Sequence, residues 1–402
     1  MESITGVFGA IAPSKFKFNN DDDSADKLSH RYTTVMLIIF AVIVSSKQFV
    51  GDPIQCWVPA HFSGSWESYA NSYCWVKNTY YLPFGEHIPK EHEEEKRHMI
   101  PYYQWVPLIL LSQALLFYIP RLMWRSLNTR TSIDVDDIVR IAEGFQKAEL
   151  ADKKESSMSM MALQMHRFLS SRNFYGGTCT LSLTAILTKI CCIGRRTGNY
   201  LSACFLLSKF LYIVNLVGQL FLMNAFLGQD FHFYGIDFIK NVANGTEWMD
   251  SARFPRVTMC DFIIRMLGNN VRYTVQCVLS INLFNEMIFL LIWFWLVVVA
   301  AVSVLNFIRW ILCTVSQQDR KRYIKKQLNL LEAINDDNAK YVDPFIKEYL
   351  RTDGVFICRI IGVNTDAVTV TEFVCEMFKY YIGEKKLPGE DVPPAEADPK
   401  SL

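Results

Sequence analysis

The sequence carries almost no net charge and has few of the residue patterns that catalysis needs. Among its 402 residues, Lys and Arg number 41 and Asp and Glu 40, so the net charge of +1 does not indicate a nucleic-acid partner. It contains no phosphate-cradling glycine loop, no metal-ligand pair at helical spacing and no nucleophile motif. His92-Glu93 does not extend to a zinc-protease motif, because Lys96 stands where the second His is required. We therefore expect neither an enzyme nor a bound cofactor or metal.

The first residues lack the features of a cleaved signal peptide. Residues 1–20 contain no continuous apolar run and no small-residue cleavage pattern, and the acidic cluster Asp21, Asp22, Asp23 follows at once. We expect this segment to remain in the mature protein.

Long apolar runs dominate the rest, since hydrophobic residues make up 51% of the chain and aromatic residues 14%. A bilayer core of about 30 Å requires roughly 20 apolar residues in a helix. Core helices of a soluble protein rarely stay apolar on all faces over this length. Pro107 and Pro120 predict that the second run is shorter or kinked. We expect membrane-spanning helices at 31–50, 106–124, 201–227 and 281–307.

The basic residues are distributed unevenly between the connecting segments. The first loop contains four Lys or Arg and the third contains five, against twelve from Arg121 to Arg196 and fourteen from Arg309 onward. Cytoplasmic loops carry the excess of positive charge, so both termini are expected in the cytoplasm. The acidic, Pro-containing tail is expected to be disordered after about residue 384. The predicted segments are thus 1–30, 125–200 and 308–402 inside the cell, and 51–105 and 228–280 outside it.

The two outside loops hold one pair of cysteines each. Cys56 and Cys74 lie in the first loop and Cys260 and Cys277 in the second, out of 11 cysteines in all. An oxidising exterior makes disulfides the expectation there, whereas the other seven should be reduced. Four cysteines allow three connectivities, and the sequence does not choose among them.

The outside loops contain two further candidate sites. Asn244-Gly245-Thr246 is an acceptor for N-glycosylation. Glu91, Glu93, Glu94 and Glu95, with His87, His92 and His98 nearby, could bind divalent cations or titrate. A solvated helix face is the more common meaning of such a cluster, so we predict no metal site.

Four short sequence blocks occur at the ends of the predicted spans. The most specific is Tyr102, Tyr103, Gln104, Trp105, Val106 at the entry to the second span. With the paired loop cysteines, the four blocks resemble the innexins, the invertebrate gap-junction channel proteins related to the pannexins. Met287 and Ser280 depart from residues that are common in that family. The blocks are Gly51–Trp57, Tyr102–Pro107, Phe254–Phe262 and Asn282–Glu286.

The resemblance implies an all-α membrane protein with four transmembrane helices per subunit. It also implies a small disulfide-braced extracellular domain and a helical cytoplasmic domain, assembled as a ring, octameric in this family, around a central pore. The implied partners are innexin subunits, in a homo- or hetero-oligomer, a ring in an apposed cell, and membrane lipid. The implied location is the plasma membrane at gap junctions, and the implied function is passage of ions and small molecules between cytoplasms. The alternative is a non-junctional hemichannel that releases ATP or other small solutes, as the related pannexins do. The acceptor at Asn244 discriminates between the two, since a glycan on a docking loop would obstruct apposition.

Several residue roles follow from the same resemblance. It implies disulfides Cys56–Cys277 and Cys74–Cys260, with pairing within each loop as the alternative. It implies that the N-terminal segment lines the pore mouth, with Glu2, Ile4 and Phe8 as candidates. Lys47 is a further pore candidate, although it could instead extend to the membrane interface.

The residues themselves suggest three smaller features. Asn215 and Gln219 in the third span could line the pore, but hydrogen bonds between helices are the preferred interpretation. Aromatic and β-branched runs at 75–76 and 79–81 predict short strands. Amphipathic patterns at 133–150 and 320–334 predict cytoplasmic helices.

Overall fold

The computed structural model describes residues 22–83, 85, 98–129, 133–147, 151–171, 198–228, 231–245, 253–266, 268–335 and 338–386. They fall into two compact units. The sheet unit comprises Ala25–Leu122 and Ser208–Asn306, and the helical unit comprises Met1–Ser24, Met123–Leu207 and Phe307–Leu402.

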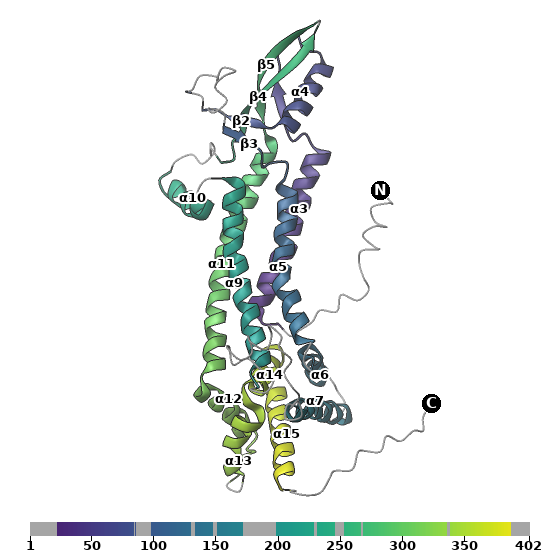
Figure 1. Cartoon of the computed structure of the whole chain (residues 1–402), viewed down its shortest axis with the longest axis vertical. Coiled ribbons are helices and arrows are strands. Elements are labelled where there is room, and N and C mark those ends of the chain that lie inside the picture. The colour runs from purple at the N-terminus through teal and green to yellow at the C-terminus, as the bar shows by residue number, and fades with distance from the viewer. Residues whose placement is uncertain are drawn as a thin grey trace, which may run out of the picture. The chain divides into compact units, whose positions relative to one another are not determined.

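Four long apolar helices lie side by side in the sheet unit (Figure 1). Each is long and apolar enough to cross a membrane, and the shortest has 23 residues. At 1.5 Å per residue that helix measures about 35 Å, which exceeds a bilayer core of about 30 Å. The first span consists of α2 (Ser24–Asp26), the π-helix η1 (Lys27–Tyr32) and α3 (Thr33–Val50), and the others are α5 (Val106–Asn128), α9 (Tyr200–Leu227) and α11 (Ser280–Val315). The end residues of α5 and α11 and the first residues of α9 belong to the helical unit.

Pro120 does not end the second of these helices. Helix α5 continues through Pro120 to Asn128, and with 23 residues it is the shortest of the four long apolar helices, in line with the prediction of a shorter or kinked span. Proline removes one backbone hydrogen bond, but a helix that broke here would leave further groups unsatisfied where no water replaces them.

Large apolar side chains cover the outward faces of these helices. Val42, Leu115 and Phe221 expose 59%, 70% and 60% of their surface. Such extensive apolar surface requires lipid or neighbouring subunits around it.

One buried ion pair joins the start of the first span to the third. Lys209 Nζ on α9 lies 2.7 Å from Asp26 Oδ2, and the two side chains are only 2% and 9% exposed. Trp295 Nε1 on α11 donates to Thr33 Oγ1 at 2.8 Å. A buried charge is tolerated only with a partner, so the pair fixes how these helix ends meet.

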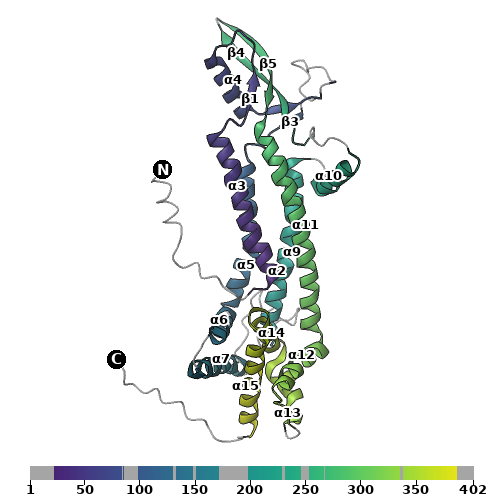
Figure 2. The same ribbon diagram turned by 180° about the vertical axis from the view of Figure 1, so that it is seen from behind.

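The other part of the sheet unit is an antiparallel five-stranded sheet, of which the sequence predicts only short strands. Its strand order is β1-β5-β4-β2-β3, and helix α4 (Gly64–Lys77) lies beside β1, β4 and β5 (Figure 2). In β4 the buried side chains alternate with more exposed ones, as a strand with one covered face requires. The strands are β1 (Gln55–Trp57), β2 (Thr79–Tyr81), β3 (His98–Ile100), β4 (Val257–Met266) and β5 (Asn269–Val278).

Only one of the two predicted short strands exists. Residues 79–81 form β2, but Trp75 and Val76 lie in the last turns of α4. Ala70 and Cys74, four residues apart, form the buried face of this helix, and this packing outweighs the strand preference of the following residues. The unit also contains the 3₁₀ turn η3 (Phe231–Phe233) and helix α10 (Tyr234–Ala243).

The helical unit has an apolar core of its own. The centroids of the Phe205, Trp310 and Phe356 rings lie 4.8–5.7 Å apart, and eight of the 14 residues of α14 are buried. The predicted amphipathic stretches are occupied by α6 and α12. The elements are α6 (Val135–Lys147), α7 (Ala151–Ser171), α12 (Gln317–Leu330), α13 (Ala339–Pro344), the π-helix η5 (Phe345–Leu350), α14 (Arg351–Asn364) and α15 (Ala367–Lys386).

Candidate functional site

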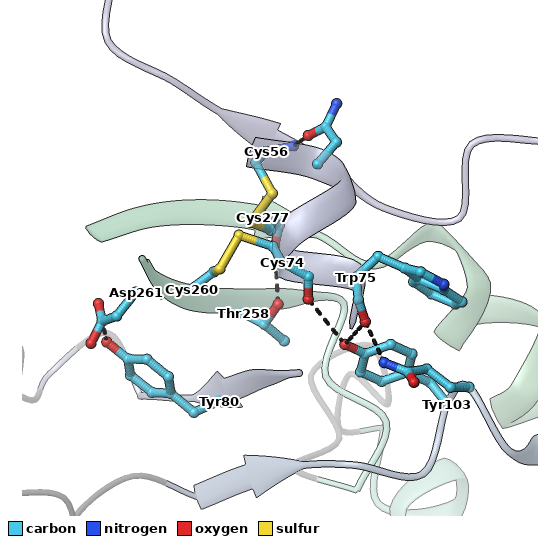
Figure 3. The surroundings of a disulfide bond; sticks show 11 residues. Cys56, Cys74, Trp75, Tyr80, Tyr103, Thr258, Cys260, Asp261 and Cys277 are labelled. Atoms are coloured by element: carbon cyan, nitrogen blue, oxygen red, sulfur yellow. Dashed lines mark hydrogen bonds between the residues drawn. A yellow bond between two sulfur atoms is a disulfide. The ribbon is translucent and has the colours of Figure 1, made fainter. Parts of the chain in front are cut away.

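Two adjacent disulfides hold the sheet together (Figure 3). Cys56 and Cys277 are register partners on β1 and β5, and their bond spans 221 residues. Cys74 on α4 is bonded to Cys260 on β4, across 186 residues. This is the pairing that the resemblance implies, and it replaces pairing within each loop. Bonds that close such long loops typically stabilise a fold by about 2–5 kcal/mol.

The proximity of these sulfur atoms does not make a metal site. The sulfur atoms of Cys56, Cys74 and Cys277 lie within 4.8 Å of one another. Each is engaged in a disulfide and has no thiolate to offer a metal ion. The cluster is therefore a cross-link of two neighbouring bonds.

The block at the entry to α5 caps the end of α4. Tyr103 Oη donates to the carbonyl oxygens of Cys74 at 3.3 Å and Trp75 at 3.2 Å. Gln104 Nε2 also donates to the Trp75 carbonyl and, at 3.1 Å, to Asn78 Oδ1. The last four carbonyls of a helix have no partner within it, so these side chains satisfy groups that burial would otherwise leave unpaired. Burial raises the pKa of Tyr103 to about 12, which keeps its hydroxyl a donor.

The flanking residues of this block divide between the interior and the surface. Tyr102 is buried, donates to the Arg253 carbonyl at 2.7 Å and meets the Phe254 ring edge-on at 5.6 Å. Burial raises the pKa of Tyr102 well above its usual value. Val106 is fully buried, whereas Trp105 is 56% exposed.

The block at 254–262 and the block at 282–286 contact each other through buried polar groups. Arg256 Nη2 lies 3.0 Å from Glu286 Oε2, whose side chain is 1% exposed. Asn282 Nδ2 donates to the Pro255 carbonyl at 2.9 Å, and Asn285 Nδ2 donates to Asn282 Oδ1 at 3.3 Å. Burying these groups costs free energy unless each finds a partner, so the two blocks depend on each other.

The first block contacts the start of α11. Ser280 Oγ donates to the Asp52 carbonyl at 2.8 Å, and the Ile281 amide donates to the Pro53 carbonyl at 3.4 Å. The hydroxyl of Ser280 thus contributes a hydrogen bond between the first block and α11. All four blocks converge where the sheet meets α5 and α11. We call this region, residues 51–57, 102–107, 253–262 and 279–286, the collar.

Two residues outside the sequence blocks also support this region. Asn71 Oδ1 on α4 accepts the Cys56 amide at 2.9 Å and fixes β1. A Cβ atom on Gly235 would lie 2.0 Å from Cε3 of Trp293, so only glycine lets α10 pack on α11 here. A single sequence carries no signal for either, because each role depends on a residue far along the chain.

The structure places some of the predicted site residues. Lys47 is half-buried, and its Nζ would be 3.1 Å from a Cβ on Gly51, so its amine lies against the end of α3. Asn244 is exposed at the end of α10. Glu2, Ile4, Phe8, the cluster at 86–97 and the tail from 387 lie outside the described residues.

Polar residues of the third span form hydrogen bonds within α9 and to the turn that follows it. Gln219 Nε2 donates to Asn215 Oδ1 at 3.2 Å, one turn away on α9. Asn224 Oδ1 accepts the amide of Phe231 at 2.9 Å. The preferred interpretation, a hydrogen bond between helices, stays a prediction for Asn215 and Gln219.

The family model for innexins matches residues 22–381. The chain is an innexin. This innexin is 38% identical to Innexin unc-9 of Caenorhabditis elegans over 390 residues, 97% of this chain and 100% of that protein. It is 35% identical to Innexin-3 of the same organism over 372 residues, 90% and 84% of the two chains. It is 30% identical to Innexin-19 of Caenorhabditis briggsae over 389 residues, 92% and 88%.

Family membership confirms the resemblance read from the four blocks. This innexin is a multi-pass membrane protein of gap junctions and a subunit of an oligomeric gap-junction channel. The four apolar helices and the two disulfides are consistent with that role. Innexins are known as channel proteins rather than enzymes.

Proposed function

We propose that this subunit docks with a channel in an apposed cell through the outer part of the β4–β5 hairpin. In this proposal the sheet unit's strands and α10 lie outside the cell, and the helical unit and both termini lie in the cytoplasm. Eight subunits form the ring, and ions and small molecules pass through it. The proposal keeps the segment limits given above, with Glu2, Ile4, Phe8 and Lys47 as pore candidates. The exposed hairpin is the observation that carries it.

The hairpin extends beyond the strands that flank it. Strands β4 and β5 pair over ten residues each, from Val257 with Val278 to Met266 with Asn269. Within the described residues, β1 pairs only with the last three residues of β5, and β2 pairs with β4 only at Met259. The remainder is a two-stranded ribbon, which is marginally stable unless something supports it.

Support for the ribbon comes from its base. Cys260 is bonded to α4, and Asp261 pairs with Arg272 at 2.5 Å and accepts from Tyr80 Oη at 3.2 Å. Beyond this point Ile263, Met266 and Val271 are 49%, 37% and 37% exposed. A stiff ribbon with exposed apolar side chains suits a surface that meets a partner.

Three observations support the proposed sidedness. The disulfides lie in the sheet unit, and oxidising conditions prevail outside the cell. The basic residues are concentrated in the segments that form the helical unit. Asn244, the glycosylation candidate, is exposed on the sheet unit.

A glycan placed at the hairpin tip tests docking and sidedness together. Val271→Thr puts threonine two residues after Asn269 and creates an N-glycosylation acceptor with a residue well suited to a strand. Glycosylation of the variant, seen as a mass shift that a glycosidase removes, would place the tip outside the cell. We expect the bulky glycan to abolish junctional current between paired cells under dual voltage clamp, while current across the single-cell membrane remains.

The control is Val271→Thr combined with Asn269→Gln, which keeps the threonine and removes the acceptor. We expect this control to restore junctional current. Full junctional current in the glycosylated variant would refute docking through the tip. Wild-type protein that gives single-membrane current and no junctional current, with or without Asn244→Gln, would instead support the hemichannel alternative.

A further inference from the structure

A basic cavity of about 450 Å³ lies within the helical unit. Four of the residues that line it are basic: Arg320, Lys321, Lys347 and Arg351. Among the residues that the structure describes, no Asp or Glu lines it. Its volume falls in the range of about 300–1,000 Å³ that small-molecule sites occupy.

The amino-terminal ends of three helices also meet at this cavity. Asn199 precedes α9, Gln317 is the first residue of α12, and Arg351 and Thr352 begin α14. A helix N-terminus carries a partial positive charge and unpaired amides. The buried Asp353 carboxylate accepts the Ser202 amide at 3.0 Å and so satisfies one unpaired amide at the N-terminus of α9. The ends of α12 and α14 add to the positive potential of the cavity.

Two of the basic side chains, Arg320 and Lys321, differ in the partners that they meet within the protein. Lys321 Nζ lies 3.2 Å from Asp343 Oδ2, so its charge is offset. Arg320 instead donates to the Thr352 hydroxyl, which brings no negative charge. Burial, and then the nearby charge of Arg359, lower the pKa of Arg320. The charged guanidinium is therefore destabilised here, and a bound anion would stabilise it.

The backbone holds one of these side chains at the cavity in an unusual way. Arg351 has a φ of +54°, a conformation that residues other than glycine rarely adopt. Its Nε donates to the Glu348 carbonyl at 3.0 Å, which fixes the guanidinium next to Lys347 on η5.

We propose that this cavity binds an anion that carries two or more phosphate groups. Guanidinium forks, ammonium groups and helix N-termini are the donors that phosphate oxygens match best. Several bases around one cavity of this size suit more than a single phosphate. A soluble inositol phosphate and the headgroup of a phosphoinositide lipid share this chemistry.

The test uses the full-length channel, purified in detergent, and inositol trisphosphate as the soluble probe. We expect binding by titration calorimetry at physiological salt, and loss of about tenfold or more in affinity for Lys347→Gln combined with Arg351→Gln. The matched control is Arg322→Gln combined with Lys326→Gln, which removes the same charge from exposed positions of α12 outside the cavity. We expect the control to bind within about twofold of the wild type.

A second arm separates the two sources of the phosphate groups. Vesicles that contain phosphatidylinositol bisphosphate are added to the channel loaded with the soluble probe. Displacement of the probe, absent in the cavity variant, supports the site and identifies a lipid headgroup. Binding of the probe without displacement supports the site and identifies a soluble anion. An equal loss of affinity in the control and the cavity variant, or no binding of either ligand, overturns the proposal.

Discussion

Both disulfides among the described residues lie in the sheet unit, whereas the described free cysteines all lie in the helical unit. In the sheet unit, three of the five strands have only three residues, and a disulfide bonds one of them, β1, to β5. In the helical unit, the buried side chains of α6, α7, α12, α14 and α15 form one continuous apolar cluster. The sheet unit also buries a continuous apolar cluster, so its disulfides add to that packing by restricting the long loops that carry the short strands.

The cysteines of the helical unit that the structure describes are free thiols. Cys358 and Cys375 are buried in its core, and burial raises the pKa of Cys358 to about 12. A thiol that stays protonated is a poor nucleophile and behaves as a small apolar side chain.

Removal of both disulfides should cause the largest difference in stability between the sheet unit and the helical unit. In Cys56→Ser combined with Cys74→Ser, we expect the sheet to lose about 2–4 kcal/mol of stability for each bond. Junctional current should be lost, and hydrogen exchange measured by mass spectrometry should accelerate in β1, β4 and β5. Exchange in α14 should stay unchanged. Equal acceleration in both units, or in the control Cys313→Ser, would show that the two units do not differ in this way.

Breaking the buried ion pair of the spans should have the next largest effect. Lys209→Met removes the lysine charge from the buried Asp26 carboxylate, and removing one member of a buried ion pair typically costs about 3–5 kcal/mol. We expect a lower Tm of the purified channel, followed by tryptophan fluorescence. Adding Asp26→Asn should recover part of the loss, because the buried carboxylate charge is then removed as well. A Tm equal to that of the wild type for Lys209→Met would mean that water or lipid reaches this pair.

A methyl group at the contact of α10 with α11 should have a moderate effect. Gly235→Ala places a carbon in the space of the Trp293 ring, and overpacking of this kind costs about 1–3 kcal/mol. The control Gly383→Ala on α15 meets no heavy atom within 4 Å. We expect a lower Tm for the first variant and no loss for the second. Equal Tm values would show that α10 moves aside freely.

The smallest effect is expected from a thiol reagent on the helical unit. At neutral pH, maleimide should not label Cys358 in the native channel, because its pKa of about 12 leaves almost no thiolate. Unfolding in detergent should expose it and lower its pKa toward the usual value. Since the folded-state pKa is raised, the thiol contributes stability below its ordinary pKa and loses that contribution as pH rises toward 12. Rapid labelling of the native protein would indicate that this core opens frequently.

Much of the collar could be predicted from the sequence, but only as separate pieces. The blocks at 51–57, 102–107, 254–262 and 282–286 were found by their residues, yet nothing in the sequence showed that they contact one another. Their hydrogen bonds join residues up to 228 positions apart, such as Ser280 and Asp52. The length of the strand pair β4–β5 and the helical end of α4 were also missed, because packing against distant residues decides them.

The sequence by itself determined the membrane class, the four spans, the cysteines that are bonded and the innexin family. These depend on local properties, namely apolar length, residue type and short blocks, which remain visible in one dimension. Only the tertiary structure decided how Tyr103 and Gln104 cap α4, why position 235 must be glycine, and that four bases from three elements line one cavity. Each of these depends on distances between residues far apart in the chain, and folding alone brings them together.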